Sequence, residues 1–548
     1  MIENPRQSES LTRAPSLETE TLKRHKLTVR EFAGSRAAQE RLVEEWRLEI
    51  EQEVAKACPL DFFPQQFEIV NWKQLQAILA RDGFPRRYEH WSFGQKYASQ
   101  DIRDTYGLGR TYELVINTDP CVAYLLDSNS VQETRTVMAH VYFHNMFFKH
   151  NSYFKQTDRK MLARMSNHAE RIRQYQNEIG PEPVERFLDL CLSLDNLIDP
   201  HSVIIQRDRG DSSRNTGLER RTRESFEPTR MQGPDYMERY INPPERLAEE
   251  VERKRREHSE KQRKTPVSPE QDVLLFLMKY APLEDWQQDI LSIVRDESYY
   301  FAPQRMTKIM NEGWASYWHS KLMTQHLLPR YPSEMIDYCE FNAMVLAPNA
   351  KSINPYRLGV RLFRDIEERW NRGQFGREWN DCTDMTERRT WDRKAGLGLE
   401  EMVSAMQTHN DLTFLDTYLT ADFCAENQMY LYERDSRGNA HVTTEEFEQI
   451  KSYFRKGLTN FGGPMLKVID SNHMNRGELV LLHTFEGQEL DMALAKTTTK
   501  NLEQLWGRPV HVVSSKEDGT PIVMSCEQSD FAVKKISGEF SAYKKSNG

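Results

Sequence analysis

Residues 131–150 read VQETRTVMAHVYFHNMFFKH. Apolar residues occur in every turn of this predicted helix, and His140 and His144 stand four residues apart. Four residues are slightly more than one helical turn, so both imidazoles lie on one helix face. Zinc-binding HExxH helices present two imidazoles to one ion with this spacing. The stretch therefore predicts a helix that carries a candidate metal site.

The histidine pair also has a purely structural interpretation. Val141 stands where HExxH enzymes carry their general-base glutamate, so a base would have to come from elsewhere in the chain. An HxxxH spacing alone is a weak signal, because two histidines in a buried helix with backbone partners have the same sequence. The pair by itself leaves both interpretations open.

A second segment, NEGWASYWH at residues 311–319, supplies a candidate third ligand. Gluzincin-type sites combine a histidine pair with a glutamate from a later helix and leave one position open for water. Glu312 has this place in the sequence, although a core-facing helix with a solvated or salt-bridged glutamate is the alternative. His319 lies on the same helix face, about 10 Å along the axis, so we expect it to support a ligand or the substrate. The candidate metal ligands are His140, His144 and Glu312, with Zn²⁺ or another divalent cation as the expected cofactor.

The candidate catalytic residues are His90, Glu113 and His319, because a site without the HExxH glutamate needs another group for proton transfer. His90 stands among aromatic residues in YEHWSFG at 88–94, before a glycine turn. Glu113 belongs to the β-rich run at 112–116, which precedes a turn. A structural hydrogen bond is the simpler explanation for His90.

The distribution of polar, apolar and charged residues along the chain predicts its domain organisation. Residues 1–30 are polar and poor in aromatic residues, so we expect a disordered tail. Residues 31–400 are expected to form a mainly α N-terminal domain with a small β element. The charge-dense stretch at 206–266 within it predicts an exposed linker with one solvated helix. Residues 401–548 alternate strand-like and helical runs, which predicts a smaller α+β C-terminal domain.

Composition excludes several classes of protein. The chain has 74 Lys and Arg against 83 Asp and Glu, so a net charge of −9 argues against binding of nucleic acid over a broad surface. Seven scattered cysteines form no CxxC pair, which argues against a zinc ribbon and for reduced thiols. No apolar run reaches the length of a membrane span, and the first thirty residues hold no secretory h-region. We therefore expect a cytoplasmic protein without a membrane span.

The motifs together resemble the SpoVR family (stage V sporulation protein R), from about residue 35 to the C-terminus. Several separate motifs occur in the same order as in the family. They are HWSFG at 90–94, YELVINTDPCVAYLLDSNS at 112–130, AHVYFHNMFFKHN at 139–151, NEGWASYWH at 311–319 and INPYRLGVRLFRDIEERW at 353–370.

The resemblance implies a biological setting more than a reaction. It implies a role in forming the spore cortex, a peptidoglycan layer, or in stationary-phase and stress responses. It also implies a PrkA-type serine kinase and its companion protein as partners. The chain departs from the family pattern at Phe143, where the pattern has glycine (HVYGH). We expect this phenylalanine to narrow access to the histidine pair.

Two functions follow as hypotheses. The first is a metal-dependent amide hydrolase with a gluzincin-like site and a peptidoglycan-related substrate. The second is a non-enzymatic regulator or scaffold that works with the serine kinase. A ferritin-like di-iron site is disfavoured, because the spacing of Glu133 and His140 does not match paired ExxH units. Stoichiometric bound metal distinguishes the first hypothesis from the second.

Overall fold

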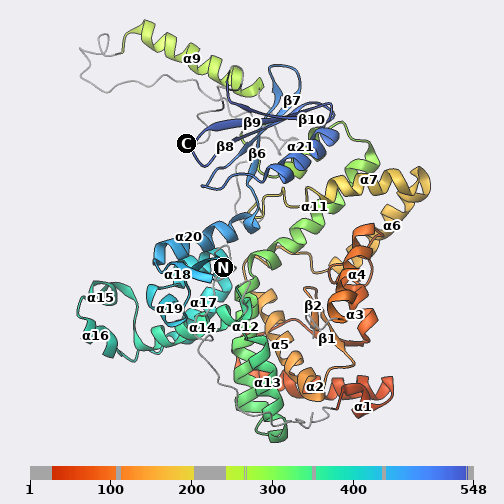
Figure 1. The fold of residues 1–548 in the computed structure, drawn as a ribbon, viewed down its shortest axis with the longest axis vertical. Coiled ribbons are helices and arrows are strands. Elements are labelled where there is room, and N and C mark those ends of the chain that lie inside the picture. The colour runs from red at the N-terminus through yellow and green to blue at the C-terminus, as the bar shows by residue number, and fades with distance from the viewer. Residues whose placement is uncertain are drawn as a thin grey trace. The chain divides into compact units, whose positions relative to one another are not determined.

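The described chain forms two compact units that interleave along the sequence (Figure 1). The computed structural model describes residues 27–105, 113–202, 242–263, 266, 268–348, 353–434, 440–537, 540 and 543. Unit 1 comprises residues 1–184 and 299–462, and unit 2 comprises residues 185–298 and 463–548. Most of the expected tail and the linker residues 206–241 lie outside the described residues. The domain boundary expected near residue 400 stays a prediction, because a compact unit is not necessarily a domain that folds on its own.

The expected fold class is confirmed. The N-terminal part is mainly helical with a small sheet, and the C-terminal part combines a larger sheet with a helix. The helices of unit 1 are α1 (Val29–Ala33), α2 (Arg36–Ala57), α3 (Trp72–Ala80), α4 (Trp91–Thr105), α5 (Val131–His150), α6 (Met161–Ile179), α12 (Lys308–Leu322), α13 (Met335–Val345), α14 (Pro355–Arg372), α15 (Gly376–Asp381), α16 (Met385–Thr390), α17 (Gly398–Thr408), α18 (Asp411–Tyr418), α19 (Ala421–Glu426) and α20 (Phe447–Leu458). Shorter helical turns are η2 (Met323–Leu327), η3 (Pro332–Glu334) and η4 (Thr459–Gly462).

Helix α5 lies at the centre of unit 1. A capping box begins it: Glu133 N–H donates to the Ser130 hydroxyl, and Ser130 N–H donates to the Glu133 carboxylate. Every residue from 134 to 148 is buried, and α5 packs against α2, α12 and α13. The predicted helix at 131–150 is thus confirmed, and both of its histidines lie in the core.

A three-stranded sheet packs beside α5. Its central strand β3 (Cys121–Leu126) pairs antiparallel with β2 (Glu113–Ile116) and parallel with β1 (Gln65–Val70). The hairpin of β2 and β3 agrees with the β-rich run expected at 112–116, although residue 112 lies outside the described residues. The parallel partner β1 comes from a segment far upstream. A second, two-stranded sheet in unit 1 consists of β4 (Leu431–Arg434) and β5 (Ala440–Thr444).

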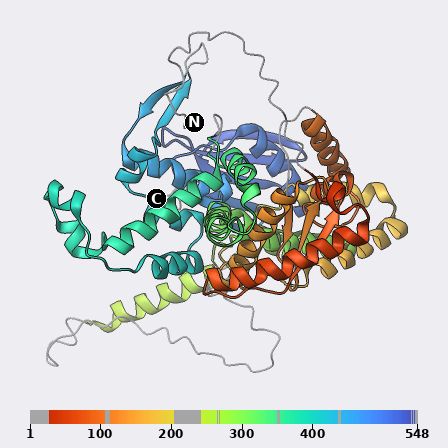
Figure 2. The same cartoon turned by 90° about the horizontal axis from the view of Figure 1, so that it is seen from below.

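Two short helices of unit 1, α15 and α16, extend away from its core in both views (Figures 1 and 2). None of their residues is buried.

Helix α14, which precedes them, lies directly against α12. The packing of α5, α12 and α14 is therefore what positions the candidate site.

Unit 2 contains a five-stranded sheet in the order β10-β9-β8-β7-β6. Strands β7 and β8 are parallel and are joined through α21, whereas the other neighbouring strands are antiparallel. Its strands are β6 (Leu466–His473), β7 (Glu478–His483), β8 (Val510–Ser515), β9 (Pro521–Glu527) and β10 (Asp530–Lys535). Its helices are α9 (Pro244–Arg263), α10 (Val273–Tyr280) and α21 (Met492–Trp506), together with most of α7 (Pro181–Leu192) and α11 (Asp285–Met306). Helix α9 is the helix expected within the charge-dense stretch.

No helix in the described part of the chain combines the length and the apolar character needed to cross a membrane.

Candidate metal centre

Helix α12 brings Glu312 to the histidines of α5. The Thr307 side chain, which precedes α12, makes no capping hydrogen bond. Instead the Asp411 carboxylate, from the start of α18, accepts from Ile309 N–H at 2.8 Å and from Met310 N–H at 2.9 Å. This remote cap satisfies backbone donors of the turn that precedes Glu312. Burial raises the pKa of Asp411 to about 7, against the opposing effect of these hydrogen bonds.

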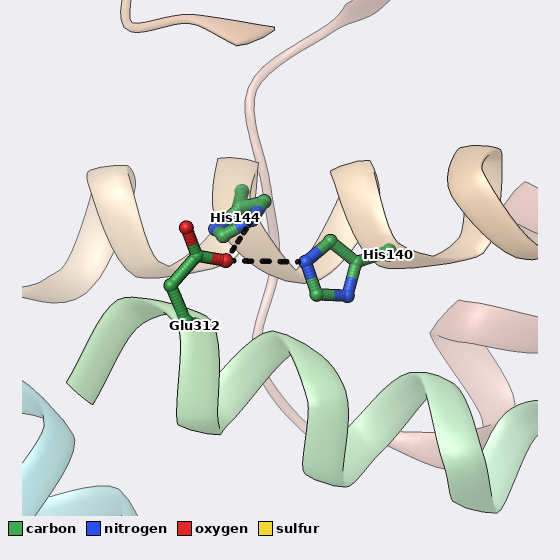
Figure 3. A group of neighbouring side chains, drawn as sticks. All are labelled: His140, His144 and Glu312. Atoms are coloured by element: carbon green, nitrogen blue, oxygen red, sulfur yellow. Dashed lines mark ion pairs between the residues drawn. The ribbon is translucent and has the colours of Figure 1, made fainter. Parts of the chain in front are cut away.

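The Glu312 carboxylate points between the two imidazoles (Figure 3). Its Oε2 lies 3.5 Å from His140 Nε2 and 3.4 Å from His144 Nε2. The exposed fractions of the three side chains are 8% for His140, 4% for His144 and 17% for Glu312. The three ligand atoms lie within 4.8 Å of one another. Residues from two distant segments thus form one cluster of metal-ligand type.

The two separations from Glu312 Oε2 fit a shared divalent ion better than hydrogen bonds. A tetrahedral ion with bonds of about 2.0–2.2 Å separates its ligand atoms by about 3.4 Å. Ordinary N–H···O hydrogen bonds are shorter, at about 2.9 Å. Glu312 Oε2 is buried and has no hydrogen-bond partner among the described residues. The donor set of two imidazole nitrogens and one carboxylate oxygen is also one that zinc accepts.

The environment of Glu312 keeps it ionised. Burial raises the pKa of Glu312, but the contacts with His140 and His144 outweigh burial and bring the pKa well below its usual range. A buried carboxylate needs a compensating positive charge. A divalent ion between the three side chains would supply it.

The orientation of His144 is set by its neighbour on α12. His144 Nδ1 lies 2.8 Å from Asn311 Oδ1. A carboxamide oxygen only accepts, so Nδ1 carries a proton, and Nε2 of the neutral ring would be the nitrogen that binds an ion. Metal-ligating histidines commonly donate their second ring N–H to such an acceptor.

His140 contacts His319 in a way that depends on the ring protons. His319 Nδ1 lies 3.0 Å from His140 Nδ1 and 3.0 Å from the Ala315 carbonyl oxygen. A neutral ring nitrogen donates or accepts, and a carbonyl only accepts. Without an ion, His319 Nδ1–H donates to the Ala315 carbonyl oxygen. When His140 binds an ion through Nε2, its Nδ1 carries the proton and donates to His319 Nδ1, and the bond from His319 to Ala315 is given up. The proton of a neutral His319 then lies on its own Nε2.

The structure brings the three predicted ligands together, and His319 contacts His140 through its Nδ1. The roles of all four residues stay predictions. His90 lies just before α4. Its Nδ1 is 2.7 Å from the Ser92 hydroxyl oxygen, and its ring packs against Trp91 and Phe93. Glu113 begins β2, and its side chain lies outside the described residues. Among the described side chains, His90 does not belong to the cluster of metal-ligand type.

Phe143 and Tyr356 shape the surroundings of the pair. Phe143 is fully buried and stacks on Trp318, with ring centroids 5.9 Å apart. Tyr356, at the start of α14, stacks on His140 with ring centroids 6.1 Å apart. The expectation that Phe143 narrows access to the site stays a prediction.

Sequence patterns did not single out several residues that surround the site. Asn311 adjoins Glu312 in the same segment, and that adjacency was a usable signal. Ser316 lies in the same segment, whereas Asp411 and Tyr338 lie in segments whose patterns predict only helices or loops. No local pattern indicates that Asp411 caps a helix that begins far upstream.

Comparison with known proteins finds a family model and a relative that each match most of this chain. A family model described as SpoVR like protein matches residues 38–463, which include all three candidate ligands. The uncharacterized protein YcgB of Escherichia coli (strain K12) is 29% identical over 496 residues, or 85% of this chain and 91% of that protein. No solved structure matches the chain.

Proposed function

The chain belongs to the SpoVR family, and from that premise we propose that it is a metal-dependent hydrolase whose ion is held by His140, His144 and Glu312. The observation that carries the proposal is the placement of Glu312 Oε2. This buried oxygen lies 3.4 and 3.5 Å from two imidazole nitrogens and has no hydrogen-bond partner among the described residues. Such spacing suits a shared ion.

The residues around the ion have separate tasks in this proposal. A zinc ion with three protein ligands keeps a fourth position open and makes water there more acidic. Asn311 holds the His144 ring in the tautomer that binds through Nε2. Glu312 serves as a ligand and therefore does not act as the general base.

His319 is the candidate for handling a proton. Burial, together with the positive charges around it, lowers the pKa of His319 well below its usual value, so the ring is neutral near pH 7. When His140 binds the ion, His319 Nδ1 accepts from His140 Nδ1 and its own proton lies on Nε2, so the ring takes up a proton only if the bond from His140 is broken. His90 and Glu113 remain further candidates for proton transfer.

The proposed reaction is hydrolysis of an amide, and a peptidoglycan-related substrate agrees with the spore-cortex role that the family resemblance implies. That role, the stationary-phase or stress setting, the cytoplasmic location and the PrkA-type kinase partner are part of the proposal. The metal test below depends on none of them.

Elemental analysis of untagged protein tests the proposal. We expect about one equivalent of divalent metal in the wild type and none in the double variant His140→Ala/His144→Ala. His150→Ala is the matched control, because His150 ends the same helix and contacts Asp61 Oδ1 at 2.8 Å instead. Circular dichroism checks that each variant folds.

A wild type that holds no metal, and whose thermal stability does not change with Zn²⁺, Mn²⁺ or Fe²⁺, would overturn the proposal. The non-enzymatic regulator or scaffold would then be the better explanation, and association with a serine kinase would be the next measurement.

A further inference from the structure

One face of α12 carries buried polar atoms beyond the metal cluster. Glu312, Ser316 and His319 follow each other at intervals of four and three residues, so they share this face. Ser316 Oγ and His319 Nε2 are buried and have no hydrogen-bond partner among the described residues. The exposed fractions of these two residues are 2% and 4%.

Helix α13 adds a third polar atom of the same kind. The ring of Tyr338 meets the ring of His319 edge to face, with centroids 6.5 Å apart. Its hydroxyl is buried and likewise has no hydrogen-bond partner in the described part of the chain. We call Ser316, His319 and Tyr338 the polar strip.

Unsatisfied atoms in such a group need an explanation. Buried polar side-chain atoms nearly always have a partner, because burial removes their hydrogen bonds to water. A single exception has many explanations, but the polar strip is contiguous with the metal cluster through His319 and His140. The missing partners are therefore expected to be atoms of a molecule that binds at this site.

The chemistry of the polar strip selects an oxygen-rich partner. Burial raises the pKa of Tyr338, so its phenol keeps its proton and can donate. The Ser316 hydroxyl also donates, and His319 carries its proton on Nε2 when His140 binds an ion. Three donors in one place suit a group that only accepts hydrogen bonds.

We propose that Ser316, His319 and Tyr338 bind a carboxylate of the substrate close to the bond that is cleaved. The substrate class is thus an N-acylated amino acid or a peptide with a free carboxylate near the scissile amide. This inference rests on the proposed metal-dependent hydrolase and adds its substrate class. Ordered water molecules that merely satisfy the three side chains are the competing explanation.

Two matched probes test the proposal on Co²⁺-loaded full-length protein. Acetohydroxamate binds a metal through its hydroxamate, and succinic monohydroxamate adds one carboxylate to the same group. Titration followed by the visible absorption of Co²⁺ yields both dissociation constants. We expect the carboxylate to strengthen binding about tenfold in the wild type, as one charge-assisted hydrogen bond does. Tyr338→Phe and Ser316→Ala should each remove most of this advantage.

Tyr317→Phe is the matched control. Tyr317 is also buried on α12, but its ring lies against Lys321 rather than against His319. It should keep the tenfold difference between the probes. Ser316→Ala removes a single oxygen atom and serves if Tyr338→Phe does not fold.

The outcomes separate this inference from the proposed function. Equal affinity for the two probes in the wild type, or an undiminished difference in Tyr338→Phe and Ser316→Ala, overturns the carboxylate site while bound Co²⁺ still supports the metal centre. Absence of Co²⁺ binding in the wild type overturns the proposed function and this inference with it.

Discussion

Gly313 and Gly359 touch backbone to backbone where α12 meets α14. A Cβ atom on Gly313 would lie 2.5 Å from the Cα and carbonyl carbon of Gly359, and a Cβ on Gly359 would lie 2.3 Å from the Ile309 carbonyl oxygen. Atoms at those separations overlap, so glycine is required on both helices. The contact fixes the position of α12 at the residue that follows Glu312. It also brings Tyr356 of α14 against the ring of His140.

We predict that Gly313→Ala destabilises the protein and disturbs the metal cluster. The added methyl group meets backbone rather than a flexible side chain, so the helices must separate, at a cost of about 1–3 kcal/mol in the free energy of unfolding. Urea denaturation measures this cost. Gly94→Ala in α4 is the control, because no described atom outside its immediate chain neighbourhood lies within 4 Å of that Cβ. Equal stability of the two variants would contradict the prediction.

We predict that Asn311→Ala weakens metal binding by about 10- to 100-fold, as loss of a partner behind a metal-ligating histidine typically does. The variant removes the acceptor that orients the His144 ring. Asn311→Asp restores an acceptor oxygen and should recover most of the affinity. Competition with a chromophoric chelator measures the dissociation constants. A fully active metal site in Asn311→Ala would show that the His144 tautomer needs no such support.

We predict that removal of metal lowers thermal stability. A ligand that binds only the folded state at 100 times its dissociation constant stabilises the protein by about 2.7 kcal/mol. The melting temperature should fall after treatment with a chelator and recover when Zn²⁺ is added. Glu312→Gln lacks the ionised ligand and should show a much smaller recovery. The same recovery in both proteins would place the ion elsewhere.

We predict that Asp411→Ala destabilises the protein by about 1–2 kcal/mol, the usual cost of losing a helix cap. The variant leaves Ile309 N–H and Met310 N–H without their acceptor. Thermal and urea denaturation measure the loss. Stability equal to that of the wild type would show that other groups satisfy the start of α12.

We also predict a pH dependence from Asp411. Its pKa rises from 3.8 in the unfolded chain to about 7 in the folded protein, because the carboxyl is buried. The folded state therefore binds the extra proton between about pH 4 and pH 7. The contribution of Asp411 to stability is complete below that window and is lost as the pH rises through it. Relative to Asp411→Asn, the free energy of unfolding of the wild type should fall from pH 4 to 7, and a flat difference would contradict the assigned pKa.

Local patterns predicted the parts of the site that lie on one element. The helix at 131–150 and the shared face of His140 and His144 follow from residue spacing alone. Glu312 was predicted as a partner only because its segment has the place of a third ligand in gluzincin-type chains. His319 was expected about 10 Å along the axis from Glu312, and it meets His140 because α5 runs alongside α12.

The sequence did not predict contacts that join remote segments. Strand β1 has no clear alternation of polar and apolar residues, and its parallel partner β3 is distant in the chain. Asp411 has the pattern of an ordinary helix-start residue for α18, yet its carboxylate caps α12. In the sequence, Gly313 and Gly359 are only residues that disfavour a helix. The close contact between α12 and α14 explains why glycine is needed at both positions.

The sequence by itself predicted the helix at 131–150, a β-rich run at 112–116 and an α+β C-terminal part, because spacing and turn residues act over a few neighbouring positions. The tertiary structure alone decided that Glu312 lies between His140 and His144, that Asp411 caps α12 and that Ser316, His319 and Tyr338 form one polar strip. These contacts depend on how closely α5, α12, α13 and α14 pack. That closeness is set by side-chain volumes and by the two facing glycines, which no local pattern records.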